Sequence, residues 1–110
     1  MRRAILAVVF VAAPLAAAAE MSVTSLRYSC ERGVEVAASY VNGADGSAVV
    51  LQVEGRQIAL LTEPSGSGAR YGWPSDGAGY VWWTKGPEAM LLWREAGTES
   101  ELLTRCRERP

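Results

Sequence analysis

The residues that could support chemistry are concentrated in one short stretch of the chain. Ser65-Gly66-Ser67-Gly68-Ala69-Arg70-Tyr71 is followed, fourteen residues after Tyr71, by the only lysine, Lys85. A serine hydroxyl becomes a nucleophile when a base lies within hydrogen-bond distance. The chain has no histidine, which is the usual base. Because alternating serine and glycine cannot form a strand core, we expect a loop that enters another molecule's site rather than one that runs a reaction.

A hydrolase with Ser67 as nucleophile and Lys85 as base is the catalytic alternative. It needs a buried lysine with a lowered pKa, whereas Thr84-Lys85-Gly86-Pro87 is typical of an exposed strand end. The Gly-x-Ser-x-Gly elbow of serine hydrolases is missing, because Ser65 occupies its first glycine position. The spacing of a phosphate-binding loop is missing too. We therefore expect no catalytic residue and no enzyme. Taken alone, the loop is more readily explained as a flexible, solvent-exposed connection.

Residues 1–19 have the features of a secretory signal peptide. Two arginines are followed by an apolar run over residues 4–13, a proline and four consecutive alanines at residues 16–19. A membrane anchor would need roughly 18 to 20 strongly apolar residues. We expect cleavage near Ala19 and export to the periplasm, with no membrane insertion afterwards. We also expect no lipidation, because no cysteine stands at the cleavage point.

Residues 20–110 then form one small domain with a mildly acidic balance. Without the two arginines of the leader, nine basic residues face twelve acidic ones, a net charge of −3. Nucleic acid requires clustered positive charge, so we expect no nucleic-acid partner. An acidic surface is compatible with a basic protein partner. No cofactor motif is present, and we expect a monomer or a weak homodimer.

The two cysteines, Cys30 and Cys106, stand near the two ends of this domain. In an exported domain of this size such a pair normally forms a disulfide. The bridge would close nearly the whole fold and contribute roughly 4 kcal/mol. Two free thiols are the alternative. A zinc site is excluded, since two cysteines without histidine cannot complete the four-ligand shell, and we expect no metal.

Alternation of apolar and polar residues indicates short strands separated by turn dipeptides. Val34, Val36, Ala38 and Tyr40, for example, share one face. We expect strands over 26–30, 34–40, 48–53, 57–61, 80–84, 89–93 and 100–106. Seven or eight strands at intervals near ten residues predict an all-β fold, either a sandwich or a small antiparallel barrel. A disulfide between the first and last strands favours the closed barrel.

Four tryptophans, Trp73, Trp82, Trp83 and Trp93, are many for a domain this small. Trp82 and Trp83 are adjacent on a predicted strand, so their side chains point to opposite faces. We expect one in the core and the other partly exposed. Stacking on sugar rings would make the protein a glycan- or peptidoglycan-binding module of the cell envelope, which is the alternative function. Packing under a loop or against the barrel exterior is the explanation we favour.

Several motifs occur together in a family-specific order. These are Tyr28-Ser29-Cys30, the Ser-Gly-x-x-Tyr element Ser67-Gly68-Ala69-Arg70-Tyr71, Trp83-Thr84-Lys85-Gly86 followed by Glu88-Ala89, and the terminal Cys106. Together they resemble the family of bacterial inhibitors of c-type lysozyme, in its membrane-bound and periplasmic forms. The resemblance covers essentially all of residues 20–110. Because it has no cysteine for lipidation at the cleavage point, the chain is similar to the periplasmic form of the family rather than to the membrane-bound form.

The resemblance implies an eight-stranded antiparallel β-barrel closed by one disulfide, with c-type lysozyme as the protein partner. It implies that Ser67 enters the lysozyme cleft, that Lys85 assists from the neighbouring strand end, and that Gly68 and Tyr71 shape the loop. The expected lysozyme-binding residues are Ser65, Gly66, Ser67, Gly68, Ala69, Arg70, Tyr71 and Lys85. The cleft of a glycosidase holds two carboxylates, to which a hydroxyl and an ammonium can hydrogen-bond.

One segment departs from the family pattern. The connection Gly72 to Gly79 is longer than we expect between the family's tyrosine and the following strand. Its Trp73-Pro74 tip would block insertion, or add a contact, if it folded over the Ser67 loop. An envelope protein that has this fold but no longer inhibits lysozyme is therefore a further alternative.

Overall fold

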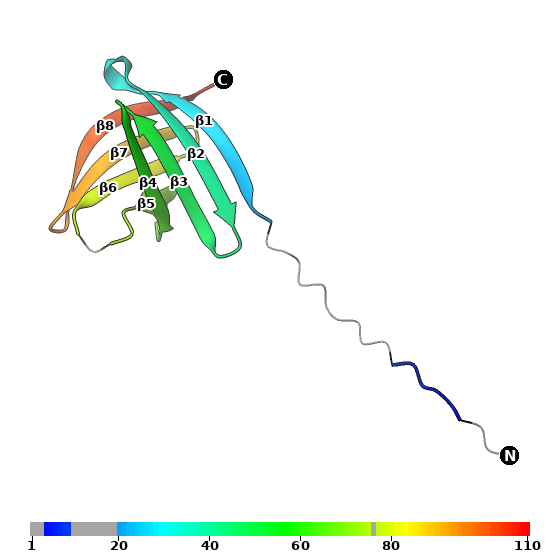
Figure 1. Cartoon of the computed structure of the whole chain (residues 1–110). Coiled ribbons are helices and arrows are strands. Elements are labelled where there is room, and N and C mark those ends of the chain that lie inside the picture. Colours follow the sequence, from blue (N-terminus) through cyan, green and yellow to red (C-terminus); the bar gives the residue numbers. More distant parts are fainter. Residues whose placement is uncertain (1–3, 10–19, 76) are drawn as a thin grey trace.

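The computed structural model describes residues 4–9, 20–75 and 77–110. Eight antiparallel strands and one 3-10 turn follow one another along the chain (Figure 1). They are β1 (Ser22–Ser29), η1 (Glu31–Gly33), β2 (Glu35–Gly43), β3 (Gly46–Val53), β4 (Arg56–Glu63), β5 (Ala69–Gly72), β6 (Gly79–Lys85), β7 (Glu88–Glu95) and β8 (Thr98–Arg109). Within the described ranges, no helix is long and apolar enough to cross a membrane. Most of the expected signal peptide, including Arg2, Arg3, Pro14 and the Ala19 cleavage point, lies outside the described residues, as does Asp76.

The strands form a closed barrel. Each strand pairs with the next in sequence, and β8 returns to β1, where Arg109 stands opposite Arg27 and Arg107 opposite Ser29. The disulfide between Cys30 and Cys106 joins the end of β1 to β8 across 76 residues of sequence. The expected all-β, eight-stranded antiparallel barrel with one disulfide is therefore confirmed.

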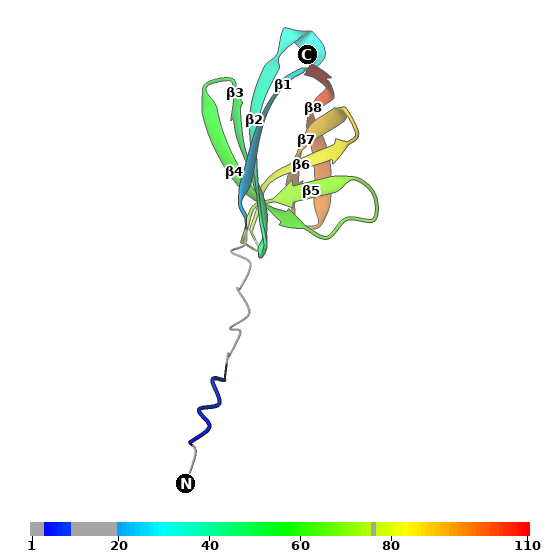
Figure 2. The ribbon, with the colours of Figure 1, turned by 90° about the vertical axis from the view of Figure 1, so that its right-hand side faces the viewer.

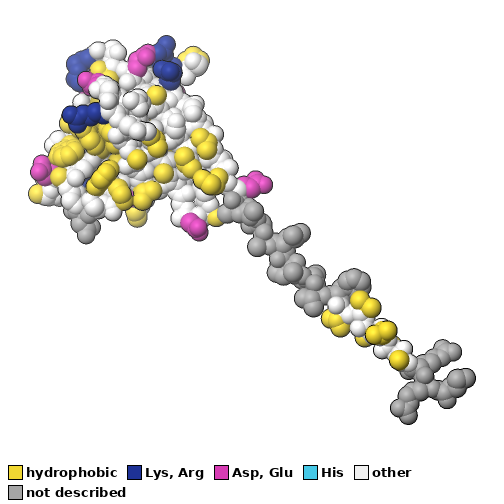
Figure 3. Space-filling view, in the orientation of Figure 1, with side chains coloured by type: hydrophobic (Ala, Val, Ile, Leu, Met, Phe, Trp, Pro, Cys, Tyr) yellow, Lys and Arg dark blue, Asp and Glu magenta, His cyan; other side chains and the backbone are white. Residues whose placement is uncertain are grey.

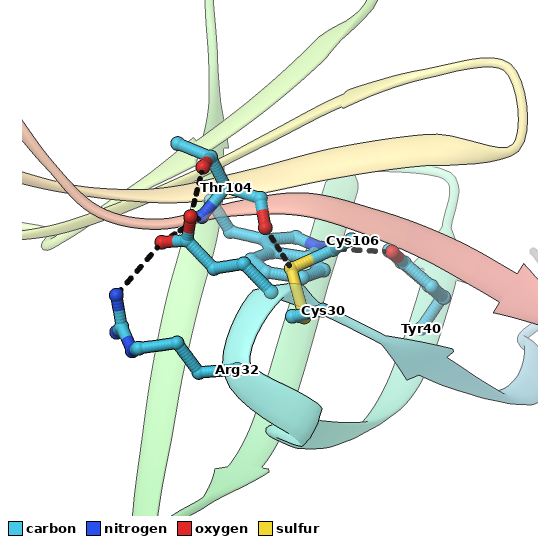
Figure 4. The surroundings of a disulfide bond; sticks show 7 residues. Cys30, Arg32, Tyr40, Thr104 and Cys106 are labelled. Carbon is cyan, nitrogen blue, oxygen red and sulfur yellow. Dashed lines mark hydrogen bonds and ion pairs between the residues drawn. A yellow bond between two sulfur atoms is a disulfide. The ribbon is translucent and has the colours of Figure 1, made fainter.

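A carboxylate holds the 3-10 turn beside the disulfide (Figure 4). Glu31 accepts hydrogen bonds from the backbone N–H of Thr104, at 3.2 Å, and from its hydroxyl, at 2.8 Å. The hydroxyl bond, followed by the backbone bond, lowers the pKa of the Glu31 carboxyl. The turn after β1 is thus fastened to β8 by two hydrogen bonds as well as by the sulfur bridge.

The barrel interior is filled by large side chains with satisfied polar atoms. Trp82 is fully buried and donates its indole N–H to the Tyr40 hydroxyl at 2.9 Å. The Tyr40 and Tyr28 hydroxyls lie 2.6 Å apart. Burial is the main cause that raises the pKa of both phenols, so both stay neutral donors at physiological pH. Val36 and Ala38 are buried beside them, with Tyr40 partly buried, as the alternation in 34–40 predicted.

The seven strands expected from the sequence are present, and β5 was missed. Residues 69–71 were expected to be loop, whereas Ala69–Gly72 pairs with β4 on one side and β6 on the other. This stretch is only four residues long, and Tyr71 in the core with Ala69 packed against it is too short a pattern to mark a strand. Its two neighbours supply the pairing that makes it a strand. The loop proper is therefore residues 64–68.

The long connection does not cover this loop. Residues 73–75 leave the far end of β5, whereas residues 64–68 enter its near end. Trp73 instead packs on Gly79, where an added Cβ would lie 2.6 Å from the Trp73 Cβ. The Trp73-Pro74 tip therefore leaves the Ser67 loop open.

We predict that replacing both cysteines with alanine lowers the free energy of unfolding by roughly 4 kcal/mol. The reason is that the unfolded chain regains the conformational entropy that a bridge across 76 residues removes. Urea denaturation followed by tryptophan fluorescence measures this loss. A loss below about 1 kcal/mol would mean that the hydrogen bonds of β1 and η1 to β8 close the barrel without the bridge.

Candidate protein-binding site

The 64–68 loop is held down on strand β6. The indole N–H of Trp83 donates to the backbone carbonyl of Ser67 at 3.0 Å. The Ser65 hydroxyl donates to the same carbonyl from within the loop. Two donors from different directions fix the backbone at Ser67, so the loop has a defined shape despite its serine and glycine content.

Gly68 is the point of closest approach between this loop and β6. Its φ of +64° lies in the left-handed region. An added Cβ would lie 2.1 Å from the Thr84 carbonyl oxygen and 2.8 Å from Cγ of Lys85. Only glycine satisfies both the conformation and the space. This contact places the residue that follows Ser67 against the Lys85 side chain.

Ser67 and Lys85 together form an exposed polar pair. Both residues are solvent-exposed. The Lys85 ammonium lies 4.2 Å from the centroid of the Trp83 ring, which holds it by a cation–π interaction. In the part of the chain that the structure describes, neither the Ser67 hydroxyl nor the Lys85 ammonium has a hydrogen-bond or ion-pair partner. One hydroxyl and one ammonium are thus available to an external acceptor.

Behind the loop, four charged side chains from four strands form a network. Glu63 accepts two hydrogen bonds from Arg94, at 2.8 and 3.0 Å. Arg70 pairs with Glu99 and lies 3.6 Å from Glu63. The Arg94 bonds are the main cause that lowers the pKa of the Glu63 carboxyl, and Glu63 in turn raises the pKa of Arg94. Gly72 leaves the room for this pairing, because an added Cβ there would lie 2.3 Å from a Glu63 oxygen.

A small apolar cluster lies on the outside of the barrel, beside the strand position of Gly72 over which this network lies. Val81 and Leu92 are almost completely buried, yet neither belongs to the interior core. They stand opposite each other on β6 and β7, and Val81 stands opposite Gly72 of β5. Since Trp82 points inward, Val81 and Trp83 point outward. The strands under the loop are therefore packed on both faces, which makes a stiff base.

Arg70 connects the network to the loop. Its guanidinium carbon lies 4.9 Å from the Trp83 ring centroid, and its side chain is only 15% exposed. Tyr71 points into the core, with its ring 5.7 Å from that of Tyr40. Of the expected contact residues, Ser65, Gly66, Ser67, Gly68 and Lys85 are exposed at the surface. Ala69 and Arg70 are partly buried, and Tyr71 is buried.

Sequence reasoning missed the residues that support the site. Trp83 stands two positions before Lys85 on the same face of β6, a spacing that could have placed it beside the lysine. Glu63, Arg94 and Glu99 gave no such signal, because only the register across β4 to β8 brings them together.

The two other functions suggested by the sequence lack an assembled site. Lys85 is exposed, whereas a catalytic lysine needs burial. Trp82 is inside the barrel, Trp83 lies beneath the loop and two cations, and Trp93 packs edge-on against Tyr80 at 5.0 Å. Trp73 is 45% exposed but stands beyond the other end of β5. The tryptophans therefore form no common stacking platform for a glycan, and the packing explanation for Trp82 and Trp83 is confirmed.

The barrel is closed, is bridged by a disulfide and presents a small polar loop. This arrangement suits a protein that binds and inhibits another protein. The family model described as "Membrane-bound lysozyme-inhibitor of c-type lysozyme" matches residues 28–100. Two curated proteins with the name "Membrane-bound lysozyme inhibitor of C-type lysozyme" are similar to the chain. The one from Cupriavidus necator is 34% identical over 80% of this chain and 68% of its own length, and the one from Pseudomonas aeruginosa is 36% identical over 83% and 69%. The chain belongs to this family.

Solved structures agree with the assignment. Pseudomonas aeruginosa MliC, solved in complex with hen egg white lysozyme, matches with a TM-score of 0.62 and 29% identity, over 98% of this chain and all of that one. Periplasmic lysozyme inhibitor PliC of Salmonella typhimurium matches with a TM-score of 0.67 over 81% of this chain and all of that one; at 20% identity it supports the fold alone. These relatives are inhibitors of an enzyme, in agreement with the expectation that the chain is not itself an enzyme.

We predict that Gly68→Ala lowers the free energy of unfolding by about 1 to 3 kcal/mol, because alanine is strained at this φ and collides with the Thr84 carbonyl. The emission of Trp83 should change as its bond to Ser67 is lost. Gly66→Ala is the matched control, since no atom lies within 4 Å of its added Cβ. Equal stability of the two variants would contradict a docked loop.

We predict that Glu63→Gln lowers stability by about 1 to 2 kcal/mol above about pH 5, because the bonds to Arg94 lose their charge. The pKa of Glu63 is lowered in the folded state, so its contribution is present above the ordinary value of 4.5 and is lost as the pH falls through the lowered pKa. The melting temperatures of Glu63→Gln and of the original protein, plotted against pH, should therefore converge in acid. Glu101→Gln, exposed and outside the network, should track the original protein at every pH. Parallel curves for Glu63→Gln would contradict the ion-pair assignment.

Proposed function

We propose that this protein inhibits c-type lysozyme by inserting the 64–68 loop into the active-site cleft. The observation that carries the proposal is the exposed pair of Ser67 and Lys85, brought together by the contact of Gly68 with β6. The partner class is supported by membership of the inhibitor family and by the solved complex of the Pseudomonas aeruginosa relative with hen egg white lysozyme.

The chemistry of the pair suits such a cleft. A glycosidase of the lysozyme type holds one carboxyl protonated and the other ionised. A serine hydroxyl can donate to the ionised group and accept from the protonated one, and a lysine ammonium carries three donors. Displacement of water from the cleft strengthens these bonds, although removal of the ammonium from water offsets part of the gain. The proposed role of Ser67 and Lys85 is thus to occupy both catalytic groups at once.

The support of the loop favours tight binding. A flexible loop would lose conformational entropy on insertion, whereas a loop already held in one shape loses little. Here Trp83 fixes the Ser67 carbonyl and also the Lys85 ammonium. The glycines at 66 and 68 leave the loop narrow enough for its backbone to approach the cleft wall. We further propose that the protein acts in the periplasm, since both curated relatives are named as membrane-bound and residues 1–19 have the features of a signal peptide.

We predict that the protein slows lysis of Gram-positive cells by hen lysozyme at near-stoichiometric ratio. Ser67→Ala and Lys85→Ala should each raise the inhibition constant by about tenfold or more, because interface residues at the centre of a pocket dominate affinity. Calorimetric titration of lysozyme gives the same comparison as binding constants.

Ser75→Ala and Arg27→Ala are the matched controls, since both residues are exposed and lie away from the loop. Melting temperatures close to that of the original protein would show that the four variants fold. Full inhibition by the Ser67→Ala/Lys85→Ala double variant would contradict the assignment of the site to these two residues. No inhibition by the original protein would contradict the proposed function.

A further inference from the structure

A polar hollow opens at one end of the barrel, where side chains of β1, β2, β5, β6 and β8 point inward. Its volume is about 250 Å³. The polar part of its lining includes Thr24, Tyr28, Tyr40, Tyr71, Thr84 and Glu108. A small-molecule pocket measures roughly 300 to 1,000 Å³. The hollow is therefore sized for the end of one long side chain rather than for a whole small-molecule ligand.

Glu108 brings a carboxylate to this hollow. It stands opposite Tyr28 in the register of β8 and β1, so both side chains lie on the inner face of the sheet. Tyr28 is almost completely buried, whereas Glu108, one residue before the end of β8, is exposed. Burial is the main cause that raises the pKa of the Tyr28 hydroxyl, and the charge of Glu108 adds to it. The carboxylate therefore lies near the tyrosine hydroxyl, on the solvent side of it.

This carboxylate has no partner within the protein. In the part of the chain that the structure describes, the Glu108 side chain makes no hydrogen bond and no ion pair. Its neighbours Arg107 and Arg109 lie on the outer face of β8, where they pair with Glu88 and Glu35. Among the described residues that line the hollow, Glu108 is the only one with a charge. The hollow thus presents one unpaired negative charge.

The groups in the hollow suit a nitrogen cation. The hydroxyls of Tyr28 and Tyr40 lie 2.6 Å apart and add neutral oxygen acceptors beside the carboxylate. An ammonium carries three N–H donors and a guanidinium five, enough for one carboxylate and its neutral neighbours. A metal ion is less suited, because in residues 4–9, 20–75 and 77–110 no group of three His, Cys, Asp or Glu could hold one.

The hollow lies beside the Ser67 loop. The backbone N–H of Glu108 donates to the Pro87 carbonyl, in the turn between β6 and β7, at 2.8 Å. On the other rim Thr84 lines the hollow, and its carbonyl is the one that Gly68 approaches. Figure 2 shows the loop before β5 and the turn between β6 and β7 on the same side of the barrel. A protein that covers the loop therefore reaches the hollow as well.

We propose that the hollow is a second contact of the complex proposed above, in which it receives a lysine or arginine side chain of the protein whose cleft the loop enters. The inference rests on the proposed function and adds a contact to it. A mildly acidic domain favours a partner with basic groups. On the outside of β2 to β4, the face that Figure 3 presents, charged side chains are few and lie at the margins. A contact made by charge is therefore expected on the side of the loop.

The first test is calorimetric titration of hen lysozyme. Glu108→Gln keeps the shape of the side chain and removes its charge, so the dissociation constant should rise by about three- to tenfold. The difference should shrink as sodium chloride is raised to about 0.5 M, because salt screens a contact between charges at the rim. Glu54→Gln, an exposed carboxylate at the other end of β4, is the matched control and should bind as the original protein does.

The second test needs no partner protein. The protein is titrated with ethylguanidinium chloride to about 100 mM, against sodium chloride of equal strength so that screening is the same. The indole N–H of Trp82 reports on the hollow in NMR spectra, since it donates to the Tyr40 hydroxyl at 2.9 Å. Its signal should shift in the original protein and in Glu54→Gln, but not in Glu108→Gln. Ethylurea, a neutral molecule of the same shape, should leave the signal in place.

Either of two results would overturn the inference: equal affinity of Glu108→Gln and the original protein for lysozyme, or a Trp82 signal that ethylguanidinium does not move. Both can occur while Ser67→Ala and Lys85→Ala still weaken binding, and the proposed function then stands without this contact. Absence of lysozyme binding by the original protein contradicts the proposed function and the second contact together. Melting temperatures close to that of the original protein would show that both glutamine variants fold.

Discussion

The contact of Gly68 with the backbone of β6 is the constraint on which the candidate site depends. A glycine in the left-handed region lets the loop approach the Thr84 carbonyl more closely than any residue with a Cβ could. The Trp83 indole then bonds the Ser67 carbonyl from below and holds the Lys85 ammonium on its ring face. One tryptophan therefore organises both polar groups, and the loop is shaped before any partner arrives.

The rest of the barrel keeps that contact in place. Two neighbours of Trp83 on β6 are fixed in place. Trp82 points inward and donates to Tyr40, and Val81 points outward and is fully buried. Arg70 lies over the Trp83 ring and joins it to the network of Glu63, Arg94 and Glu99. On the opposite side of the barrel, β1 to β4 have no such covering layer. The strands that carry the polar loop are thus reinforced on their outer face.

Much of this arrangement was predictable from the sequence, and the limits have physical causes. Alternation located seven strands because each places several side chains in one core. It failed for β5, because this strand is only four residues long and its pairing is imposed by the neighbouring strands. The motif residues Ser67 and Lys85 were found through their types and the family resemblance. The partnership of Glu63 with Arg94, 31 residues apart, was not, because it depends on the register of the barrel and on the space above Gly72.

The central claim is that the loop occupies the cleft in which lysozyme holds its substrate. Calorimetric titration of hen lysozyme with this protein, in the presence of increasing concentrations of a chito-oligosaccharide that fills the cleft, tests that claim most directly. The account predicts that the apparent affinity falls in proportion to the fraction of clefts occupied by sugar, as in simple competition. An affinity that is independent of the sugar would place the contact elsewhere on lysozyme and contradict the account.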